Sequence, residues 1–106
     1  MVVELVTLAE FTSHIRNNDM LVFDFHASWC PPCKAIDPIF RKLAVENPTV
    51  VFAKIDVDLS PEISKFAKIK CMPTYLFYRD EELVNTLEGA DEEELKRLVK
   101  EFVTAK

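Results

Sequence analysis

Apolar residues fall in short runs of strand length that alternate with segments in which they recur every three or four residues. Residues 2–6, 20–27 and 50–57 are rich in β-branched and aromatic side chains, which is typical of strands. Residues 20–27 are apolar on both alternating faces apart from Asp24 and His26, as expected of a central strand covered by helices on each side. The pattern predicts a sheet whose strands are separated by helices.

Capping residues and prolines mark the starts of three of the predicted helices. These starts are Thr7 with Glu10, Ser60 with Pro61, and Asp91 with Glu94. A further helix follows Cys33, where apolar residues recur with helical spacing up to Leu43.

The C-terminal part of the chain changes character. Residues 74–78 and 83–87 flank a polar turn at 79–82, so they predict an antiparallel hairpin. Strands and helices alternate up to that point, and a last helix follows it. The sum is an α/β fold with a mixed sheet between helices. At 106 residues the chain is expected to form one domain spanning 1–106.

Charge and hydropathy narrow the expected partners and location. The chain has 13 basic and 18 acidic side chains, a net charge of −5, and no basic cluster, so nucleic acid is not expected as a partner. The start of the chain lacks the pattern of a signal peptide, and no segment has the length and hydropathy of a membrane span. We expect a soluble protein of the cytoplasm.

Three cysteines in a cytosolic chain indicate chemistry rather than a disulfide framework, because cytosolic thiols are held reduced. Cys30 and Cys33 lie three residues apart at a predicted helix start, so their sulfurs can form a disulfide that opens and closes. Unpaired N–H groups and the helix dipole stabilise a thiolate at Cys30. The pair therefore predicts a redox site in which Cys30 is the attacking thiol.

Two prolines separate the cysteines. Pro31 and Pro32 have no N–H, so the Cys33 N–H remains as a donor to the Cys30 sulfur. Pro32 disfavours helical geometry at the preceding residue, and we expect the helix to begin at or after Pro32. The loop is also expected to give a redox potential different from that of a loop with glycine at position 31.

A structural zinc site is the alternative interpretation of the Cys30-x-x-Cys33 pair. Such a site takes four ligands, and only Cys71, His14 and His26 could supply the rest. No second pair has metal-binding spacing. We therefore expect no metal.

Asp24 lies in the middle of an apolar strand, where an ionised carboxylate is costly. Its pKa is expected to be raised unless a cation pairs with it, and such a group can transfer protons. The alternative is a structural acid paired with Lys54.

Seven motifs together resemble the thioredoxin family, specifically its animal cytosolic kind, along the whole chain. They are Asp24-Phe25, Trp29-Cys30, Pro32-Cys33-Lys34, Pro38, Asp56-Val57-Asp58, Lys70-Cys71-Met72-Pro73-Thr74 and Gly89-Ala90. The resemblance implies a five-stranded mixed sheet flanked by four helices and an activity that reduces protein disulfides. The chain departs from the family pattern at Pro31 and at the turn Asp80-Glu81, where thioredoxins usually or often have glycine.

The resemblance also implies roles for individual residues. Asp24 would be the acid-base partner of Cys33, and Pro73 a cis-proline beside the disulfide that turns the Met72 backbone toward an incoming peptide. An apolar rim around an exposed reactive thiol would dock substrates. The rim residues would be Trp29, Pro31, Met72, Gly89 and Ala90.

The same resemblance implies partners. The protein would hold no bound cofactor beyond its Cys30-Cys33 disulfide, and electrons would come from NADPH through thioredoxin reductase. Its substrates would be oxidised proteins such as peroxiredoxins, ribonucleotide reductase and methionine sulfoxide reductase, and it would act as a monomer. A competing interpretation is a redox-dependent binding or regulatory subunit with the same fold. A secretory oxidase or isomerase would need an export signal.

Cys71 is the odd thiol. It is either packed and inert, or a surface cysteine open to glutathionylation and intermolecular bridging, and its exposure decides between the two.

Overall fold

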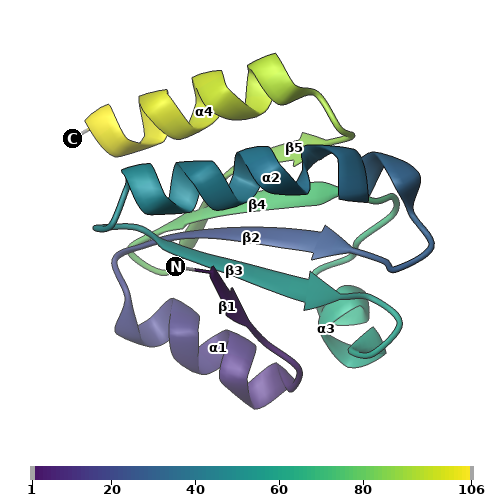
Figure 1. Ribbon diagram of the computed structural model, residues 1–106. Coiled ribbons are helices and arrows are strands. Elements are labelled where there is room, and N and C mark those ends of the chain that lie inside the picture. The colour runs from purple at the N-terminus through teal and green to yellow at the C-terminus, as the bar shows by residue number, and fades with distance from the viewer. Residues whose placement is uncertain (1, 106) are drawn as a thin grey trace.

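The computed structural model describes residues 2–105 as a five-stranded sheet with helices on both faces (Figure 1). In chain order the elements are β1 (Val2–Glu4), α1 (Leu8–Asn17), β2 (Met20–His26), α2 (Pro31–Glu46), β3 (Val51–Asp56), α3 (Pro61–Phe66), β4 (Thr74–Arg79), β5 (Glu82–Glu88) and α4 (Glu92–Thr104). The predicted mixed sheet with four helices is confirmed.

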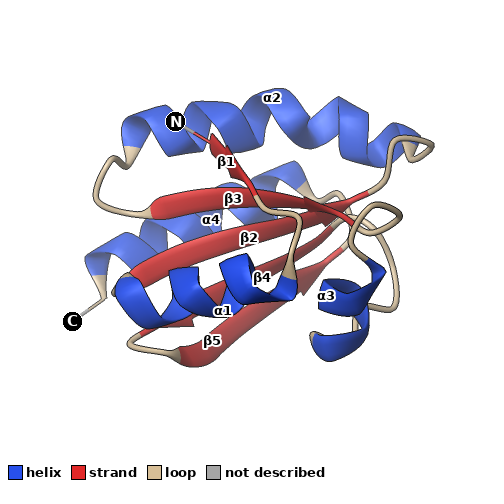
Figure 2. Ribbon diagram, turned by 90° about the horizontal axis from the view of Figure 1, so that it is seen from below, coloured by secondary structure: helices blue, strands red, loops and turns tan. Residues whose placement is uncertain are grey.

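The strands lie in the order β1-β3-β2-β4-β5. β1, β3 and β2 are parallel, whereas β4 is antiparallel to β2 and β5 is antiparallel to β4. The parallel neighbours β2 and β3 need a crossover connection, which α2 supplies, while α1 connects β1 to β2 with β3 lying between them in the sheet. Helices α1 and α3 lie on one face of the sheet and α2 and α4 on the other (Figures 1 and 2).

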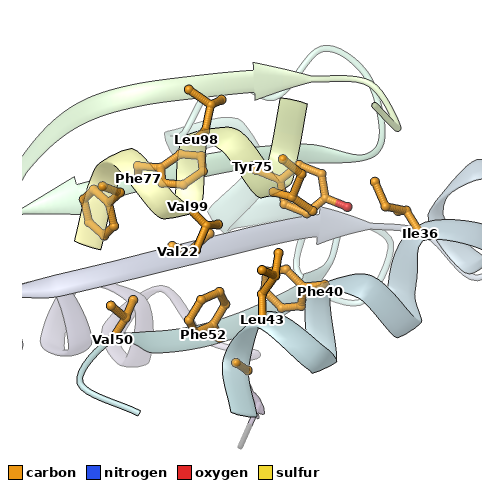
Figure 3. Close-up of a cluster of buried hydrophobic side chains, with 13 residues drawn as sticks. Val22, Ile36, Phe40, Leu43, Val50, Phe52, Tyr75, Phe77, Leu98 and Val99 are labelled. Atoms are coloured by element: carbon orange, nitrogen blue, oxygen red, sulfur yellow. The ribbon is translucent and has the colours of Figure 1, made fainter. Parts of the chain in front are cut away.

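Side chains of β2 alternate between two separate cores because strand residues point to opposite faces. Val22 joins the aromatic cluster under α2 and α4, where Figure 3 shows it with Phe40 and Phe52. Phe23 and Phe25 join the cluster under α1 and α3. Both faces of the central strand are thus buried, as its sequence predicted.

Local signals in the sequence fix two of the element ends. The Thr7 hydroxyl accepts from the Glu10 N–H at 3.1 Å, and the Glu10 carboxylate accepts from the Thr7 N–H at 2.9 Å, which confirms the capping box. The hairpin turn consists of Asp80 and Glu81, both left-handed with φ of 50° and 69°. Two left-handed residues match the twist of the flanking strands, although these residue types adopt that region reluctantly.

Two local predictions were wrong, and a third was confirmed only in position. Helix α2 begins at Pro31 rather than at or after Pro32, because the first helical positions need no N–H and proline already has a helical φ. The helix start at Ser60 and Pro61 is confirmed, but the Ser60 hydroxyl makes no capping hydrogen bond and is buried with no partner within residues 2–105. The strands predicted at 2–6 and 50–57 are shorter, since they end where their pairing ends.

Candidate active site

The cysteine pair lies where the central strand β2 leads into α2. Cys30 is the N-cap residue of the helix, with φ of −98° and ψ of 99°, and the helix begins at the next residue. Cys30 and Cys33 are joined by a disulfide, with their Cα atoms 5.3 Å apart. The first helical turn thus brings the two sulfurs together, as the spacing predicted.

The Cys33 N–H donates to the Cys30 sulfur at 3.2 Å. It is the donor that the sequence left after two prolines removed the others. A helix N-terminus stabilises negative charge, so this arrangement favours a thiolate at Cys30 once the disulfide is opened. In the disulfide state Cys30 is only 4% exposed, and Cys33 6%. The expectation of an exposed thiol at Cys30 was therefore wrong for this state, because Ala27, Val57 and Met72 pack against the pair.

The segment before β4 lies against the disulfide. The Met72–Pro73 peptide is cis, as the resemblance implied. The Met72 carbonyl oxygen lies 3.8 Å from the Cys30 sulfur. The Gly89 N–H donates to the Pro73 carbonyl at 2.9 Å, and Gly89 has a left-handed φ of 103° that favours glycine. Pro73, just before β4, and Gly89, just after β5, are thus held together next to the Met72 segment.

Trp29 is the most prominent exposed apolar side chain at the site, at 62% exposure. Its indole Nε1 donates to the Asp58 carboxylate at 2.7 Å. Asp58 is a functional-site residue whose role sequence reasoning missed, since only the fold brings the β3–α3 loop beside the β2–α2 loop. Pro31, the first residue of α2, is exposed as well. Ala90 is exposed too and lines a shallow hollow with Pro32.

Asp24 is buried in β2, at 2% exposure, and its Oδ1 has no hydrogen-bond partner within residues 2–105. Burial raises the pKa of this carboxyl to about 7, and the positive charge of Lys54 opposes the rise only in part. The raised pKa that the sequence predicted is confirmed. Asp24 can therefore gain and lose a proton near neutral pH.

Lys54 is the neighbour of Asp24 on β3, in register with it. Its ammonium nevertheless forms an ion pair with Asp37 on α2, and the other Asp37 oxygen accepts from Arg41 at 2.8 Å. The alternative interpretation of Asp24 as an acid paired with Lys54 was wrong. The Lys54–Asp37 pair could not be predicted from local sequence, because 17 residues separate its members.

The comparisons with known proteins agree with this geometry. The thioredoxin family model matches residues 2–101. This chain belongs to the thioredoxin family. Thioredoxin of Ophiophagus hannah is 39% identical over 91% of this chain and 93% of its own length. The mitochondrial thioredoxin-3 of Saccharomyces cerevisiae is 40% identical over 95% of this chain and 80% of its own length.

Solved structures of thioredoxins superpose closely. Plasmodium falciparum thioredoxin has a TM-score of 0.92 at 36% identity, covering 94% of this chain and 98% of that one. A chain solved in work on the thiol-resolving mechanism of yeast mitochondrial 1-Cys peroxiredoxin via the glutathione and thioredoxin systems has a TM-score of 0.90 at 39% identity, with 94% of each chain covered. The fold is the thioredoxin fold, and the protein is a thioredoxin-type protein disulfide reductase whose redox pair is Cys30–Cys33.

The remaining candidate residues of this thioredoxin lie outside the redox pair. Cys71 is exposed, and its sulfur lies 3.8 Å from the Thr74 hydroxyl oxygen. The His14 Nδ1–H donates to the Glu10 carbonyl at 2.8 Å. His26 lies on the same strand face as Asp24, with a pKa lowered by burial. Within residues 2–105 these side chains do not gather into a group of three that could hold a metal ion.

No helix among the described residues has the length and apolar character needed to cross a membrane.

Proposed function

We propose that this thioredoxin reduces protein disulfides in two exchange steps. The Cys30 thiolate attacks one sulfur of the substrate disulfide, so a Cys30–substrate disulfide forms and the first substrate thiolate leaves. Cys33 loses its proton and attacks the Cys30 sulfur, which closes the Cys30–Cys33 disulfide and releases the second substrate thiolate. Two electrons pass from the protein to the substrate. The observation that carries this order is the Cys33 N–H donating to Cys30 at the start of α2.

Asp24 is proposed to accept the Cys33 proton. It lies on the sheet face that α2 covers, and its pKa of about 7 suits a group that exchanges protons near neutrality. Lys54 is proposed as a supporting residue, because its positive charge holds the pKa of Asp24 lower than burial alone would.

Substrate docking is assigned to the surface around Cys30. The Met72 carbonyl beside the sulfur offers an acceptor to an extended substrate backbone, with Pro73 fixing that segment. The exposed indole of Trp29 gives an apolar contact. Pro31, Gly89 and Ala90 complete the rim, and Pro32 stiffens the loop.

Electrons are proposed to return from NADPH through thioredoxin reductase, with no cofactor bound to the chain itself. Oxidised peroxiredoxins are one proposed substrate class, supported by the resemblance to the chain solved in the peroxiredoxin work. Ribonucleotide reductase and methionine sulfoxide reductase are further proposed partners. We assign the protein to the animal cytosolic kind of thioredoxin, acting as a monomer of one domain in the cytoplasm. The relative from Saccharomyces cerevisiae, at 40% identity, is mitochondrial.

Trapping of the mixed disulfide tests the order of attack. Cys33→Ser should accumulate a covalent complex with an oxidised protein substrate through Cys30, because the resolving thiol is gone. Cys30→Ser should form no complex at this pair. Mass spectrometry after non-reducing separation checks both results, in a Cys71→Ser background that removes the exposed third thiol. A complex held by Cys33 in the Cys30→Ser variant would contradict the proposal.

A redox-dependent binding subunit is the second candidate, favoured by the large exposed indole beside the pair. NADPH oxidation linked to thioredoxin reductase and a protein disulfide decides between the two. The reductase proposal predicts turnover that Cys30→Ser abolishes, whereas a pure binding module would give no turnover.

Cys71 is proposed as a regulatory thiol, since it is exposed and lies next to the docking segment at Met72. Treatment with oxidised glutathione should add one glutathione to the wild type with the Cys30–Cys33 disulfide intact, and none to Cys71→Ser. Equal labelling of the two proteins would contradict this role.

A further inference from the structure

Of the two acids near Lys54, Asp37 is paired with two cations, whereas Asp24 forms no ion pair within residues 2–105. Lys54 is largely buried, with 10% of its side chain exposed, and its ammonium contacts the Asp37 carboxylate. Arg41 holds the second oxygen of Asp37. Asp24, although in register with Lys54 on the next strand, has an unpartnered oxygen within residues 2–105. The cation nearest to Asp24 is thus engaged elsewhere.

The arrangement lies beside the resolving cysteine. A hollow of about 270 Å³ is lined by Cys33, Lys34, Asp37, Lys54 and His26, together with Ala27 and Ser28. Cys33 and Asp37 are one helical turn apart on α2, and both line this hollow together with Lys54 of β3. A change at Asp37 therefore alters the charge in the hollow that Cys33 lines.

We propose that Asp37 is a positioning residue for the resolving step, which holds the Lys54 ammonium in an ion pair of its own and so leaves Asp24 without a counter-ion. This inference rests on the proposed role of Asp24 as proton acceptor. An unpaired Asp24 keeps its proton up to near-neutral pH and is a stronger base once ionised. With Asp37 removed, Lys54 is free to turn toward Asp24 on the neighbouring strand.

The groups that face Asp24 come from every element packed around it. Lys54 lies on β3, Tyr75 on β4 in register with Asp24, and Asp37 and Arg41 on α2. His26 lies on the same face of β2. The negative charge of Asp37 itself also raises the pKa of Asp24. Loss of Asp37 therefore lowers the pKa of Asp24 in two ways. It removes a negative charge that repels the Asp24 carboxylate, and it releases Lys54.

The test follows the resolving step as a function of pH in a Cys71→Ser background. The reduced protein is mixed with an aromatic disulfide that releases a coloured thiolate. The first release reports attack by Cys30, and the second reports closure of the Cys30–Cys33 disulfide. The midpoint is the pH at which the rate of the second release is half its maximum. In Asp37→Asn this midpoint should move down by about one pH unit, so that at pH 6 the second release is about fivefold faster than in the parent. The titration of the Asp24 carboxyl carbon, followed by NMR, should show its midpoint lowered by the same amount.

Two further variants separate positioning from a structural role. Asp37→Glu keeps the charge and should restore a midpoint close to the parent's. In the double variant Asp37→Asn with Lys54→Gln, the midpoint should move back up, because the buried cation in register with Asp24 is gone and the remaining cation, Arg41, is 52% exposed and screened by solvent. Glu101→Gln breaks an exposed ion pair with Arg97 on α4 and is the matched control without a shift.

Asp24→Asn distinguishes failure of the inference from failure of the proposed function. If Asp24→Asn retains the midpoint of the parent, Asp24 is not the proton acceptor and the proposed mechanism is wrong. If Asp24→Asn removes that midpoint but Asp37→Asn leaves it where it was, only the role of Asp37 is overturned. A downward shift in Asp37→Asn that Lys54→Gln fails to reverse would overturn the part assigned to Lys54.

Discussion

The two faces of the sheet differ in what they bury. Under α1 and α3, the side chains of β2 are Leu21, Phe23 and Phe25, which join a cluster of aliphatic and aromatic side chains, with the uncharged Thr74 in register with Phe25. Under α2 and α4, the same strand places Asp24 between Val22 and His26, and Lys54 and Tyr75 lie beside it on the neighbouring strands. Both buried charged residues of the described chain, Asp24 and Lys54, thus lie on the α2 and α4 face, near the active site.

This difference shows how one strand serves stability and chemistry at once. A buried carboxyl with an unpartnered oxygen lowers stability, since its ionisation is opposed by its surroundings. The aromatic packing of the opposite face offsets that cost, with Phe11 contacting Phe23 at a centroid distance of 4.7 Å. Variants that remove one of these contributions at a time separate the two faces by experiment.

The largest effect is expected on the apolar face. Phe23→Ala should lower the free energy of unfolding by about 3–5 kcal/mol, because Phe23 is fully buried and its loss leaves a cavity. Denaturant unfolding monitored by circular dichroism measures this. Phe66→Ala is the matched control, since that ring is 57% exposed, and it should cost far less. Equal losses for the two variants would contradict the division of the faces.

The charged face should make stability depend on pH. Burial raises the pKa of Asp24 to about 7 in the folded protein, against about 3.9 in the unfolded chain. The folded state therefore binds the proton more tightly, and the free energy of unfolding falls as pH rises from about 4 to 7, by an amount of order 4 kcal/mol. Above about pH 7 Asp24 is ionised in both the folded and the unfolded state, so its contribution to the free energy of unfolding no longer changes with pH.

The comparison of oxidised wild type with Asp24→Asn isolates that dependence. Other acids, such as Asp37, have lowered pKa values that act in the opposite direction and remain in both proteins. The wild type should lose stability relative to the variant between pH 4 and 7 in denaturant titrations. Parallel curves for the two proteins would show that Asp24 titrates normally.

A smaller effect is expected at Tyr75, whose hydroxyl is buried with no partner within residues 2–105. Tyr75→Phe removes this group and keeps the ring packed on Phe40, so it should raise the free energy of unfolding by about 1 kcal/mol. Thermal and denaturant unfolding measure the gain. A loss of similar size would mean that the hydroxyl is satisfied in solution.

The smallest effect lies outside both faces, at the hairpin turn. Glu81 is left-handed, a conformation that glycine adopts without strain. Glu81→Gly should raise the free energy of unfolding by about 0.5 kcal/mol, and Glu82→Gly, one residue later in β5, should lower it. Gain or loss in both variants alike would show that the turn conformation does not decide the outcome.

Local signals made the redox pair and most elements predictable from sequence. The spacing of Cys30 and Cys33, the capping box at Thr7 and the polar turn at Asp80 depend on residues a few positions apart. What was missed depends on the tertiary fold. The pairing of Lys54 with Asp37 arises only once β3 lies beside β2 under α2. The Trp29–Asp58 hydrogen bond likewise joins two loops that are distant in the sequence.

Two variants of neighbouring residues test whether the chemistry depends on the charged face of β2 alone. The rate of disulfide closure is measured in each. Phe23 and Asp24 are adjacent but face opposite sides of the sheet. At pH 8, Asp24→Asn should slow release of the second coloured thiolate roughly 100-fold, because it removes the proton acceptor. Phe23→Leu should leave the rate per folded molecule within about twofold while lowering stability. An unchanged rate in Asp24→Asn, or an equal slowing in both, would contradict the separation of stability and chemistry between the two faces.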